Sequence, residues 1–152
     1  MDKFLLDTNI LIHLMRGRSV AQQVKTYIDG FADPQLFISV VSLAEAESLV
    51  VQWKWSSHNI ERLIKLMNSF ISIDIEQSNQ LLINNYVAID AFSQGKQTAP
   101  SGQNLNNSSR NMGKNDLWIA ATAYALEATL ITTDRDFDHL HNLFFAIQKF
   151  ET

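Results

Sequence analysis

Cysteine is absent from the 152-residue sequence, which excludes a disulfide framework, zinc sites built on thiolates and cysteine nucleophiles. An excess of positive charge is also lacking. Twelve Lys and Arg stand against sixteen Asp and Glu, for a formal net charge of −4, so no overall basic field attracts polyanions. Any contact with nucleic acid must therefore be local.

Long hydrophobic runs are missing as well. The apolar stretch over 4–15 is interrupted by Asp7, Asn9 and His13, and no small-residue cleavage site follows it, so it is not typical of a signal peptide. No uninterrupted apolar stretch approaches the roughly 18 residues that a membrane-spanning helix needs. We therefore expect a cytoplasmic protein with no membrane association.

Hydrophobic residues make up 46% of the chain, enough for one domain over 1–152 with a sizeable core. Short apolar runs alternate with segments of helical periodicity. Strands are predicted at 4–6, 36–41, 70–73, 129–132 and, less regularly, 144–147; helices are predicted at 10–15, 20–28, 42–53, 60–67, 76–92 and 116–127. This alternation indicates an α/β fold with a central, mostly parallel sheet covered by helices on both sides.

Residues 95–113 interrupt the alternation. Gly, Ser, Asn, Gln and Pro dominate this segment, and its apolar residues are limited to Ala99, Leu105 and Met112. This composition predicts a polar, mobile loop.

Four carboxylates map to the sheet edge where ligands of parallel α/β folds collect, beyond the carboxyl ends of the strands. Asp7 follows the first predicted strand, and Glu45 lies just beyond the second. Asp116 begins the last long helix, and Asp134 follows the strand at 129–132. The topology therefore predicts one acidic pocket.

Each of these acids also has a structural explanation when taken alone. Asp7 can cap the following helix, and Ser42 with Glu45 has the spacing of a capping box. Asp116 suits the positive end of a helix dipole, and Asp134 can be an ordinary turn residue. Together, however, crowded carboxylates are costly to ionise. A hard divalent cation such as Mg²⁺ or Mn²⁺ relieves that cost through oxygen ligands.

The ordered motifs of the chain resemble those of PIN-domain ribonucleases, most closely the VapC-like toxins of prokaryotic toxin–antitoxin systems. The resemblance spans nearly the whole chain. Its motifs are Leu6-Asp7-Thr8-Asn9-Ile10-Leu11, Ser42-Leu43-Ala44-Glu45, Asn115-Asp116-Leu117-Trp118-Ile119-Ala120-Ala121 and Thr133-Asp134-Arg135-Asp136-Phe137.

The resemblance implies a three-layer α/β/α PIN-like fold and a metal-dependent endoribonuclease. The residues at the family's acidic positions, and thus the implied catalytic residues, are Asp7, Glu45, Asp116 and Asp134, with Asp7 and Asp116 as the principal ligands of Mg²⁺ or Mn²⁺. Thr8 and Asn9 match polar positions that steady the pocket, whereas Asp136 matches a position that is more often structural. The implied partners are an RNA substrate, a small VapB-like antitoxin and a second copy in a homodimer.

The implied Mg²⁺ or Mn²⁺ explains how the phosphodiester bond can be hydrolysed. A bound divalent cation lowers the pKa of a water ligand, which then attacks phosphorus in line, and it offsets the charge that develops on the phosphoryl oxygens. Glu45 or Asp134 can orient that water. Arg110, Lys114 and Arg135 neighbour the acidic motifs and can contact phosphates, although a solvated surface role is the stronger expectation for each.

Other features carry less functional weight. His139 and His141 form an acidic and histidine-rich tract with their neighbours, but they fall in a predicted turn without a distant partner ligand, so a second metal site is not expected. Trp53, Trp55 and Trp118 can stack on bases. Burial in the core or in a partner interface is the stronger expectation, because their neighbours follow helical apolar spacing.

Two alternatives belong to other functional classes. A catalytically silent PIN-like module would bind RNA or a protein, although all four acidic positions are present. A phosphatase of the haloacid dehalogenase type also has an acidic first strand, but Asp7-Thr8-Asn9 lacks the second aspartate needed for its acid–base chemistry. Under the nuclease hypothesis, we expect residues 95–113, with Lys96 and Arg110 but no carboxylate, to help choose the RNA.

Overall fold

The computed structural model describes residues 2–73 and 75–152. Its centre is a five-stranded sheet in the order β3-β2-β1-β4-β5, with every neighbouring pair parallel. The strands are β1 (Lys3–Leu6), β2 (Gln35–Ser39), β3 (Ile71–Ile73), β4 (Thr129–Thr132) and β5 (Ile147–Lys149). The predicted parallel α/β architecture is confirmed.

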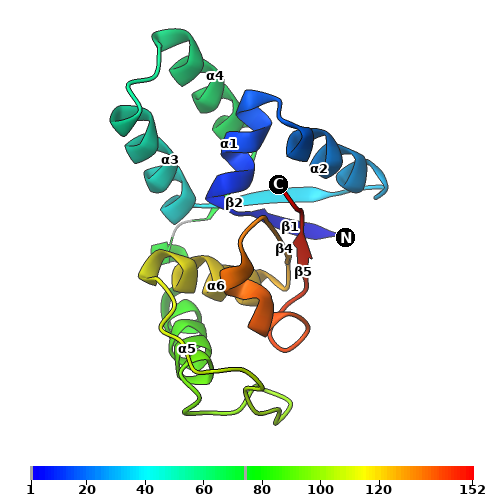
Figure 1. The fold of residues 1–152 in the computed structure, drawn as a ribbon, viewed down its shortest axis with the longest axis vertical. Helices are drawn as coiled ribbons and strands as arrows, with labels where there is room; N and C mark the ends of the chain where they lie inside the picture. The colour runs from blue at the N-terminus through cyan, green and yellow to red at the C-terminus, as the bar shows by residue number, and fades with distance from the viewer. Residues whose placement is uncertain (1, 74) are drawn as a thin grey trace.

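Helices cover both faces of this sheet. They are α1 (Thr8–Arg16), α2 (Ser19–Asp29), α3 (Val40–Gln52), α4 (Ser57–Asn68), α5 (Ile75–Ser93) and α6 (Lys114–Leu126), with a 3₁₀ helix, η1 (Arg135–Leu140), after β4. Helices α1 to α4 lie on one side of the sheet and α5 and α6 on the other (Figure 1). Among the described residues, no helix is long and apolar enough to cross a membrane.

Alternate residues of the first strand face the two helical layers. Phe4 and Leu6 pack with Ile10 and Val24 of α1 and α2, whereas Leu5 packs with Ile89 and other apolar residues of α5 and α6. This burial on both faces explains why the strand is a continuous apolar run instead of an alternating one.

The boundary between β2 and α3 differs from the prediction. The strand ends at Ser39, whose hydroxyl oxygen accepts a hydrogen bond of 3.1 Å from the backbone N–H of Val41, and the helix begins at Val40. Ser42 is buried, and its hydroxyl has no partner among the described residues, so the predicted capping box of Ser42 and Glu45 is wrong. The β-branched valines favoured a longer strand, and both serines are suitable N-caps.

The last strand also lies later than predicted. Phe144 and Phe145 precede β5 and are buried in the core beneath α5 and α6. The Phe144 ring meets Phe92 and Tyr124 edge-on, with centroids 5.3 Å and 5.4 Å apart. Their hydrophobicity therefore serves packing between helices and not a strand.

Residues 94–113 connect α5 to α6 without any helix or strand and extend beyond the end of α5 (Figure 1). Ala99 and Met112 are buried. The backbone N–H of Arg110 donates a 2.8 Å hydrogen bond to the carbonyl oxygen of Ser93. The loop itself is as predicted, whereas its mobility stays a prediction.

Candidate active site

The carboxyl ends of neighbouring strands place the four predicted acids along one edge of the sheet. Asp7 directly follows β1, and Asp134 lies two residues after β4, the neighbour of β1. Glu45 is in the second turn of α3, which follows β2, and Asp116 is in the first turn of α6. Figure 1 shows the starts of α1, α3 and α6 converging beside the sheet.

Asp7 is the most buried of these acids, with 4% of its surface exposed. Its Oδ1 accepts a 2.8 Å hydrogen bond from the backbone N–H of Thr8, and its Oδ2 accepts one of 2.8 Å from the hydroxyl of Thr132. The pKa of Asp7 is raised to about 6, mainly by burial and in smaller part by the charges of Glu45 and Asp134, while the two hydrogen bonds lower it. The helix-capping role expected for Asp7 therefore coexists with a place in the acidic cluster.

Two threonine hydroxyls link these acids to one another. The hydroxyl of Thr8 donates a 2.7 Å hydrogen bond to Oε1 of Glu45. The hydroxyl of Thr132 bridges two acids, because it donates to Asp7 while it accepts a 2.9 Å hydrogen bond from the backbone N–H of Asp134. Thr132 is fully buried, and sequence reasoning missed it because a threonine at the end of a strand has an ordinary structural explanation.

Asp116 has the most perturbed carboxyl group of the site. Burial first, and then the negative charges of Asp7, Asp134, Glu45 and Asp136 in that order, together raise the pKa of Asp116 to about 7. Without a counter-ion, this carboxyl group is only partly ionised at neutral pH. The crowding expected from the sequence is therefore present, and a cation would relieve it.

A fifth acid joins this cluster. Carboxylate oxygens of Asp116, Asp134 and Asp136 all lie within 4.8 Å of one another. Oδ1 of Asp134, the residue that caps η1, accepts a 2.9 Å hydrogen bond from the backbone N–H of Asp136, the second residue of η1. Sequence analysis favoured a structural role for Asp136, but the geometry makes it a candidate ligand as well. The sequence feature that could have indicated a ligand role for Asp136 is its spacing of two residues from Asp134.

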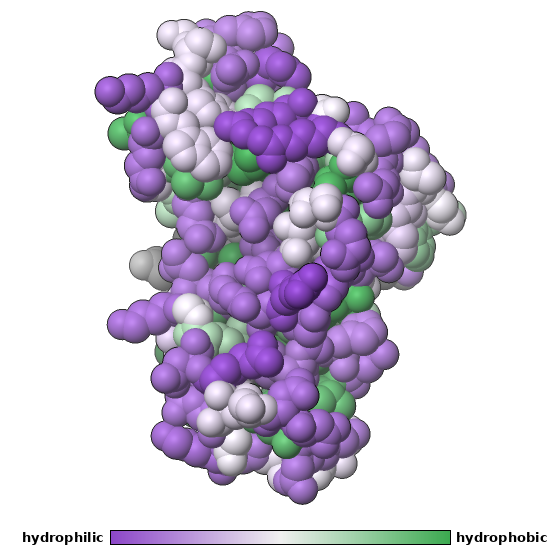
Figure 2. Space-filling model, in the orientation of Figure 1, coloured by the Kyte–Doolittle hydropathy of each residue, from purple (hydrophilic) through white to green (hydrophobic). Residues whose placement is uncertain are grey.

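A cleft of about 570 Å³ runs along α3 from this acidic cluster. Glu45 and Asn115 line one end, and Gln52 lines the other. Lys114 begins α6 and Arg135 begins η1, and both are exposed at the same edge as the acids. This exposure agrees with the surface role expected for them, and their contact with phosphate stays untested. Figure 2 shows a mainly hydrophilic surface across the middle of this face.

The histidines near the C-terminus have structural partners. His139 is buried, and its Nε2 lies 2.7 Å from the hydroxyl oxygen of Ser93. Nδ1 of His141 accepts a 2.9 Å hydrogen bond from the backbone N–H of Ile147. The two histidines thus contact different parts of the chain, and the expectation that the tract is not a second metal site stays a prediction.

The three tryptophans differ in their surroundings. Trp118 is half-buried, and its ring centroid lies 4.5 Å from that of Tyr86. Trp53 is 46% exposed, and the guanidinium of Arg16 lies 4.9 Å from its ring centroid and 5.1 Å from that of Trp55. Burial of Trp53 within this chain is therefore not observed, and its burial against a partner stays a prediction.

Comparison with known proteins places the fold and the motifs in one family. The sequence matches the PIN domain family over residues 4–143. It is 30% identical over 143 residues to Ribonuclease VapC1 of Haemophilus influenzae strain R2866, an alignment that covers 92% of this chain and 93% of the relative. The chain therefore belongs to the PIN domain family.

Solved structures show the same architecture. The VapBC2 structure from Rickettsia felis, bound to a promoter DNA fragment, aligns with a TM-score of 0.70 at 22% identity and covers 98% of this chain and 99% of that one. The VapBC-1 structure from nontypeable Haemophilus influenzae aligns with a TM-score of 0.64 at 25% identity and covers 97% of both chains. The PIN-like fold expected from the motifs is thus confirmed.

Proposed function

We propose that this protein is a divalent-metal-dependent endoribonuclease and the toxin of a toxin–antitoxin pair. The observation that carries the proposal is the convergence of five carboxylates on the edge of a parallel sheet, with the pKa values of Asp7 and Asp116 raised to about 6 and about 7. The name of the VapC1 relative gives the reaction class, because that protein is called a ribonuclease.

The donor set fits a hard cation. Asp7 and Asp116 are the proposed principal ligands of Mg²⁺ or Mn²⁺, and Asp134 and Asp136 supply further carboxylate oxygens next to Asp116. A divalent ion held by these residues would lower the pKa of a bound water and offset negative charge on the phosphate. In its absence, the acids would repel a phosphodiester, so RNA binding at the cluster depends on the ion.

Glu45 is the proposed residue that orients the attacking water and accepts its proton. Its Oε1 is held by the hydroxyl of Thr8 at 2.7 Å, so the carboxylate is positioned before substrate binds. Asp134 is the alternative for this role, but its Oδ1 already accepts a hydrogen bond from the backbone N–H of Asp136. Hydrolysis forms a bond from the water oxygen to phosphorus and breaks the bond from phosphorus to the leaving ribose oxygen, which takes up a proton from solvent, and Glu45 returns its proton to solvent.

The direct test uses purified protein and a labelled single-stranded RNA. We expect cleavage with Mg²⁺ or Mn²⁺, none with EDTA, and loss of cleavage in Asp7→Asn and Asp116→Asn, which keep side-chain size but remove charge. Asp33→Asn is the control, because Asp33 is exposed and lies outside the cluster. Wild-type cleavage by either cluster variant would remove that residue from the mechanism.

The proposed partners follow from the surface and from the relatives. Three apolar side chains of α5, namely Leu81, Ile83 and Val87, are 54%, 47% and 56% exposed, and such an apolar face suits a second copy of the chain. The clustered carboxylates suit an arginine from a small VapB-like antitoxin, because guanidinium pairs bidentately with carboxylate. Solved structures of related fold include a toxin–antitoxin complex from Klebsiella pneumoniae.

The toxin assignment is tested in cells. Expression of the protein alone is expected to arrest growth, whereas the Asp116→Asn variant and co-expression with a neutralising antitoxin are expected to restore it. A catalytically silent PIN-like module is the alternative, and it would be harmless. Harmless expression together with no RNA cleavage under metal-replete conditions would favour that alternative.

A further inference from the structure

We propose that residues 94–111 form a preformed binding site for a nucleotide of single-stranded RNA, on the loop that leads to Asp116 of the acidic cluster. This site would hold a part of the substrate that flanks the bond to be cut, and it rests on the proposed ribonuclease function. It consists of two adjoining concavities of about 370 Å³ and about 270 Å³, which share Lys96 and Ser109 in their walls. We refer to the two together as the loop pocket.

The loop pocket is built where the outgoing and returning limbs of the loop touch. Gly95 has a φ of 74°, in the left-handed region that favours glycine. A Cβ at this position would lie 3.7 Å from Cβ of Ser109 and 3.9 Å from Cδ2 of Leu105. Leu105 is half-buried and packs against the core, so it gives the larger concavity an apolar wall.

The rest of the loop pocket is lined by amide and basic side chains, which are suited to contact nucleotides. Gln97, Asn104 and Asn107 contribute amides to the larger concavity, and Arg110 and Asn111 line the smaller one. Amide groups carry both donors and acceptors that can pair with base edges, and single-stranded bases are the usual targets of sequence-specific RNA recognition. The cations suit phosphate oxygens.

These polar groups are free for a ligand. Among the side chains of residues 2–73 and 80–152, those of Lys96, Asn104 and Asn107 make no hydrogen bond or ion pair with one another or with any other, and all three are exposed. Gln94 differs, because its amide donates a 2.8 Å hydrogen bond to Oδ1 of Asp90. Asp90 is thus the acid that flanks the loop pocket, and its carboxylate already has a hydrogen-bond donor.

The backbone of the loop is held in place before any ligand binds. The backbone N–H of Ala99 donates a 2.8 Å hydrogen bond to the carbonyl oxygen of Gln103, and the N–H of Gly102 donates one of 2.8 Å to the carbonyl oxygen of Ala99. On the returning limb, the N–H of Arg110 bonds to the carbonyl of Ser93, and the Ser93 hydroxyl contacts Sδ of Met112 at 3.3 Å. A preorganised loop loses less entropy on binding than a mobile one.

Two connections join the loop pocket to the acidic cluster: a short stretch of chain and a contact between side chains. Gly113 follows Arg110 by three residues, so their Cα atoms are at most about 11 Å apart. A Cβ at Gly113 would lie 3.7 Å from Oδ2 of Asp116. In addition, Ser93 contacts His139 of η1 at 2.7 Å, and η1 carries Asp136. One RNA strand can therefore occupy both sites.

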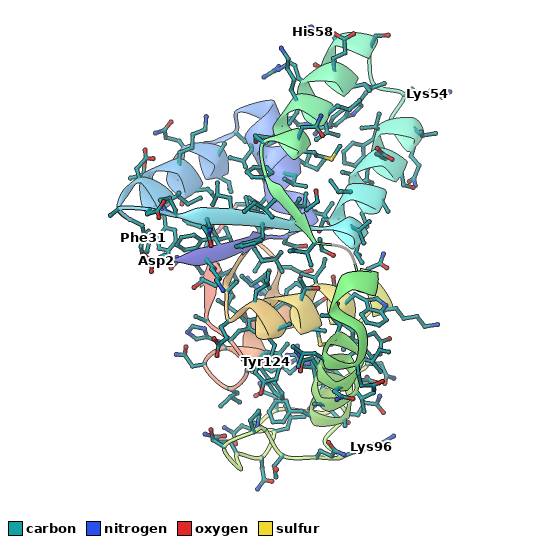
Figure 3. The ribbon with its side chains drawn as sticks, turned by 180° about the vertical axis from the view of Figure 1, so that it is seen from behind. Asp2, Phe31, Lys54, His58, Lys96 and Tyr124 are labelled. Carbon is teal, nitrogen blue, oxygen red and sulfur yellow. The ribbon has the colours of Figure 1, made fainter. Side chains whose placement is uncertain are left out.

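Charge distribution favours RNA over a protein as the occupant. The stretch 94–114 contains three basic residues, Lys96, Arg110 and Lys114, and no acidic residue, although the whole chain has a net charge of −4. Lys96 lies at the end of the molecule opposite the α3–α4 hairpin that carries Lys54 and His58 (Figure 3). The loop pocket thus concentrates positive charge in one region of an acidic protein, as a local phosphate contact requires.

The test measures RNA binding separately from cleavage. Fluorescently labelled single-stranded oligoribonucleotides of one base each (A, C or U) are titrated with the Asp116→Asn protein in EDTA, so that RNA is not cut. Lys96→Ala with Arg110→Ala is expected to raise Kd about tenfold and to reduce the slope of log K against log salt by about 1.4, since each phosphate contact on a single strand contributes about 0.7. The control pair is Lys25→Ala with Lys65→Ala, exposed lysines of α2 and α4, and its Kd should not change.

The amides are tested by selectivity. Asn104→Ala with Asn107→Ala should reduce the difference in Kd between the A, C and U strands while leaving the salt slope unchanged, because base contacts specify and phosphate contacts position. Both residues are exposed, so folding should be retained, and this is checked by the melting temperature.

Several outcomes would overturn the loop pocket. These are no binding by the parent protein at about 50 mM salt, equal Kd values for the parent and both loop variants, or an effect of the loop variants on a protein partner but not on RNA. A wild-type protein that binds these strands through the loop pocket but cuts no RNA with Mn²⁺ would contradict the proposed nuclease function and the role of the loop pocket in holding substrate, and would leave only RNA binding by the loop pocket.

Discussion

The hydroxyl of Thr132 donates a 2.8 Å hydrogen bond to Oδ2 of Asp7, a residue 125 positions earlier in the chain. The same hydroxyl accepts a 2.9 Å hydrogen bond from the backbone N–H of Asp134. Since β1 and β4 are neighbours in the sheet, one buried side chain fixes the separation of two acids that come from different strands. This contact also lowers the pKa of Asp7 against the effect of burial.

Replacement of Thr132 tests this bridge. Thr132→Val keeps the shape of the side chain but removes both hydrogen bonds, so it should raise the pKa of Asp7 further and destabilise the protein by about 1–3 kcal/mol, the usual cost of leaving a buried polar group unpaired. Mn²⁺ affinity, measured by calorimetry at pH 7, should fall at least several-fold. Thr132→Ser keeps the hydroxyl and is expected to retain most of the affinity; equal affinity in Thr132→Val and wild type would contradict the bridge.

Asp136 offers a second test, directed at the composition of the metal site. Asp136→Asn removes a carboxylate whose oxygen lies within 4.8 Å of oxygens of Asp116 and Asp134, so it should weaken Mn²⁺ binding. Asp138→Asn is a matched control from the same 3₁₀ helix, since Asp138 is exposed and forms an ion pair with Lys149 at 2.7 Å. If both variants bind Mn²⁺ like wild type, Asp136 has only the structural role that the sequence favoured.

Most of the fold could be predicted because each strand is a short apolar run between helical segments. The run of Phe4, Leu5 and Leu6 is buried on both faces, which is the situation that such runs indicate. The errors are local. Val40 favours a strand by its own propensity, yet it begins α3 because the preceding Ser39 caps the helix.

The candidate site was predictable to the extent that topology determines it. Parallel strands bring their carboxyl ends to one edge, so Asp7 and Asp134 could be placed together without coordinates. The contacts between side chains could not be predicted this way. The bonds of Thr8 to Glu45 and of Thr132 to Asp7 depend on rotamers and on the exact start of each helix, which periodicity does not define.

The bond between Thr8 and Glu45 gives a third prediction. Thr8→Val removes the donor that holds Oε1 of Glu45 at 2.7 Å and leaves the proposed metal ligands in place. We expect kcat for RNA cleavage to fall by roughly tenfold, less than the roughly 10²–10⁴-fold that a general acid–base group contributes, because Glu45 itself remains, with little change in Mn²⁺ affinity. Thr8→Ser should restore the rate. A Thr8→Val variant that loses metal affinity instead would place Thr8 with the ligands and not with Glu45.

Protonation of the acidic cluster gives the last prediction, which concerns stability in EDTA. The pKa values of Asp7 and Asp116 rise from 3.8 to about 6 and about 7 on folding. Between about pH 4 and pH 7 the folded protein therefore binds more protons than the unfolded chain, so these two groups make the protein more stable as the pH falls through this range. His139 acts in the opposite direction, because burial lowers its pKa from 6.5 to about 4.

A comparison with the double variant Asp7→Asn, Asp116→Asn separates these contributions, because His139 is present in both proteins. In EDTA, the melting temperature of the wild type relative to the double variant should rise by several degrees when the pH is lowered from 8 to 5. At pH 8, saturating Mn²⁺ should raise the melting temperature of the wild type and leave that of the double variant nearly unchanged, since a ligand that binds the folded state stabilises it by mass action. A difference between the two proteins that does not vary with pH would mean that the two carboxyl groups are not perturbed, and an equal response to Mn²⁺ would place the ion elsewhere.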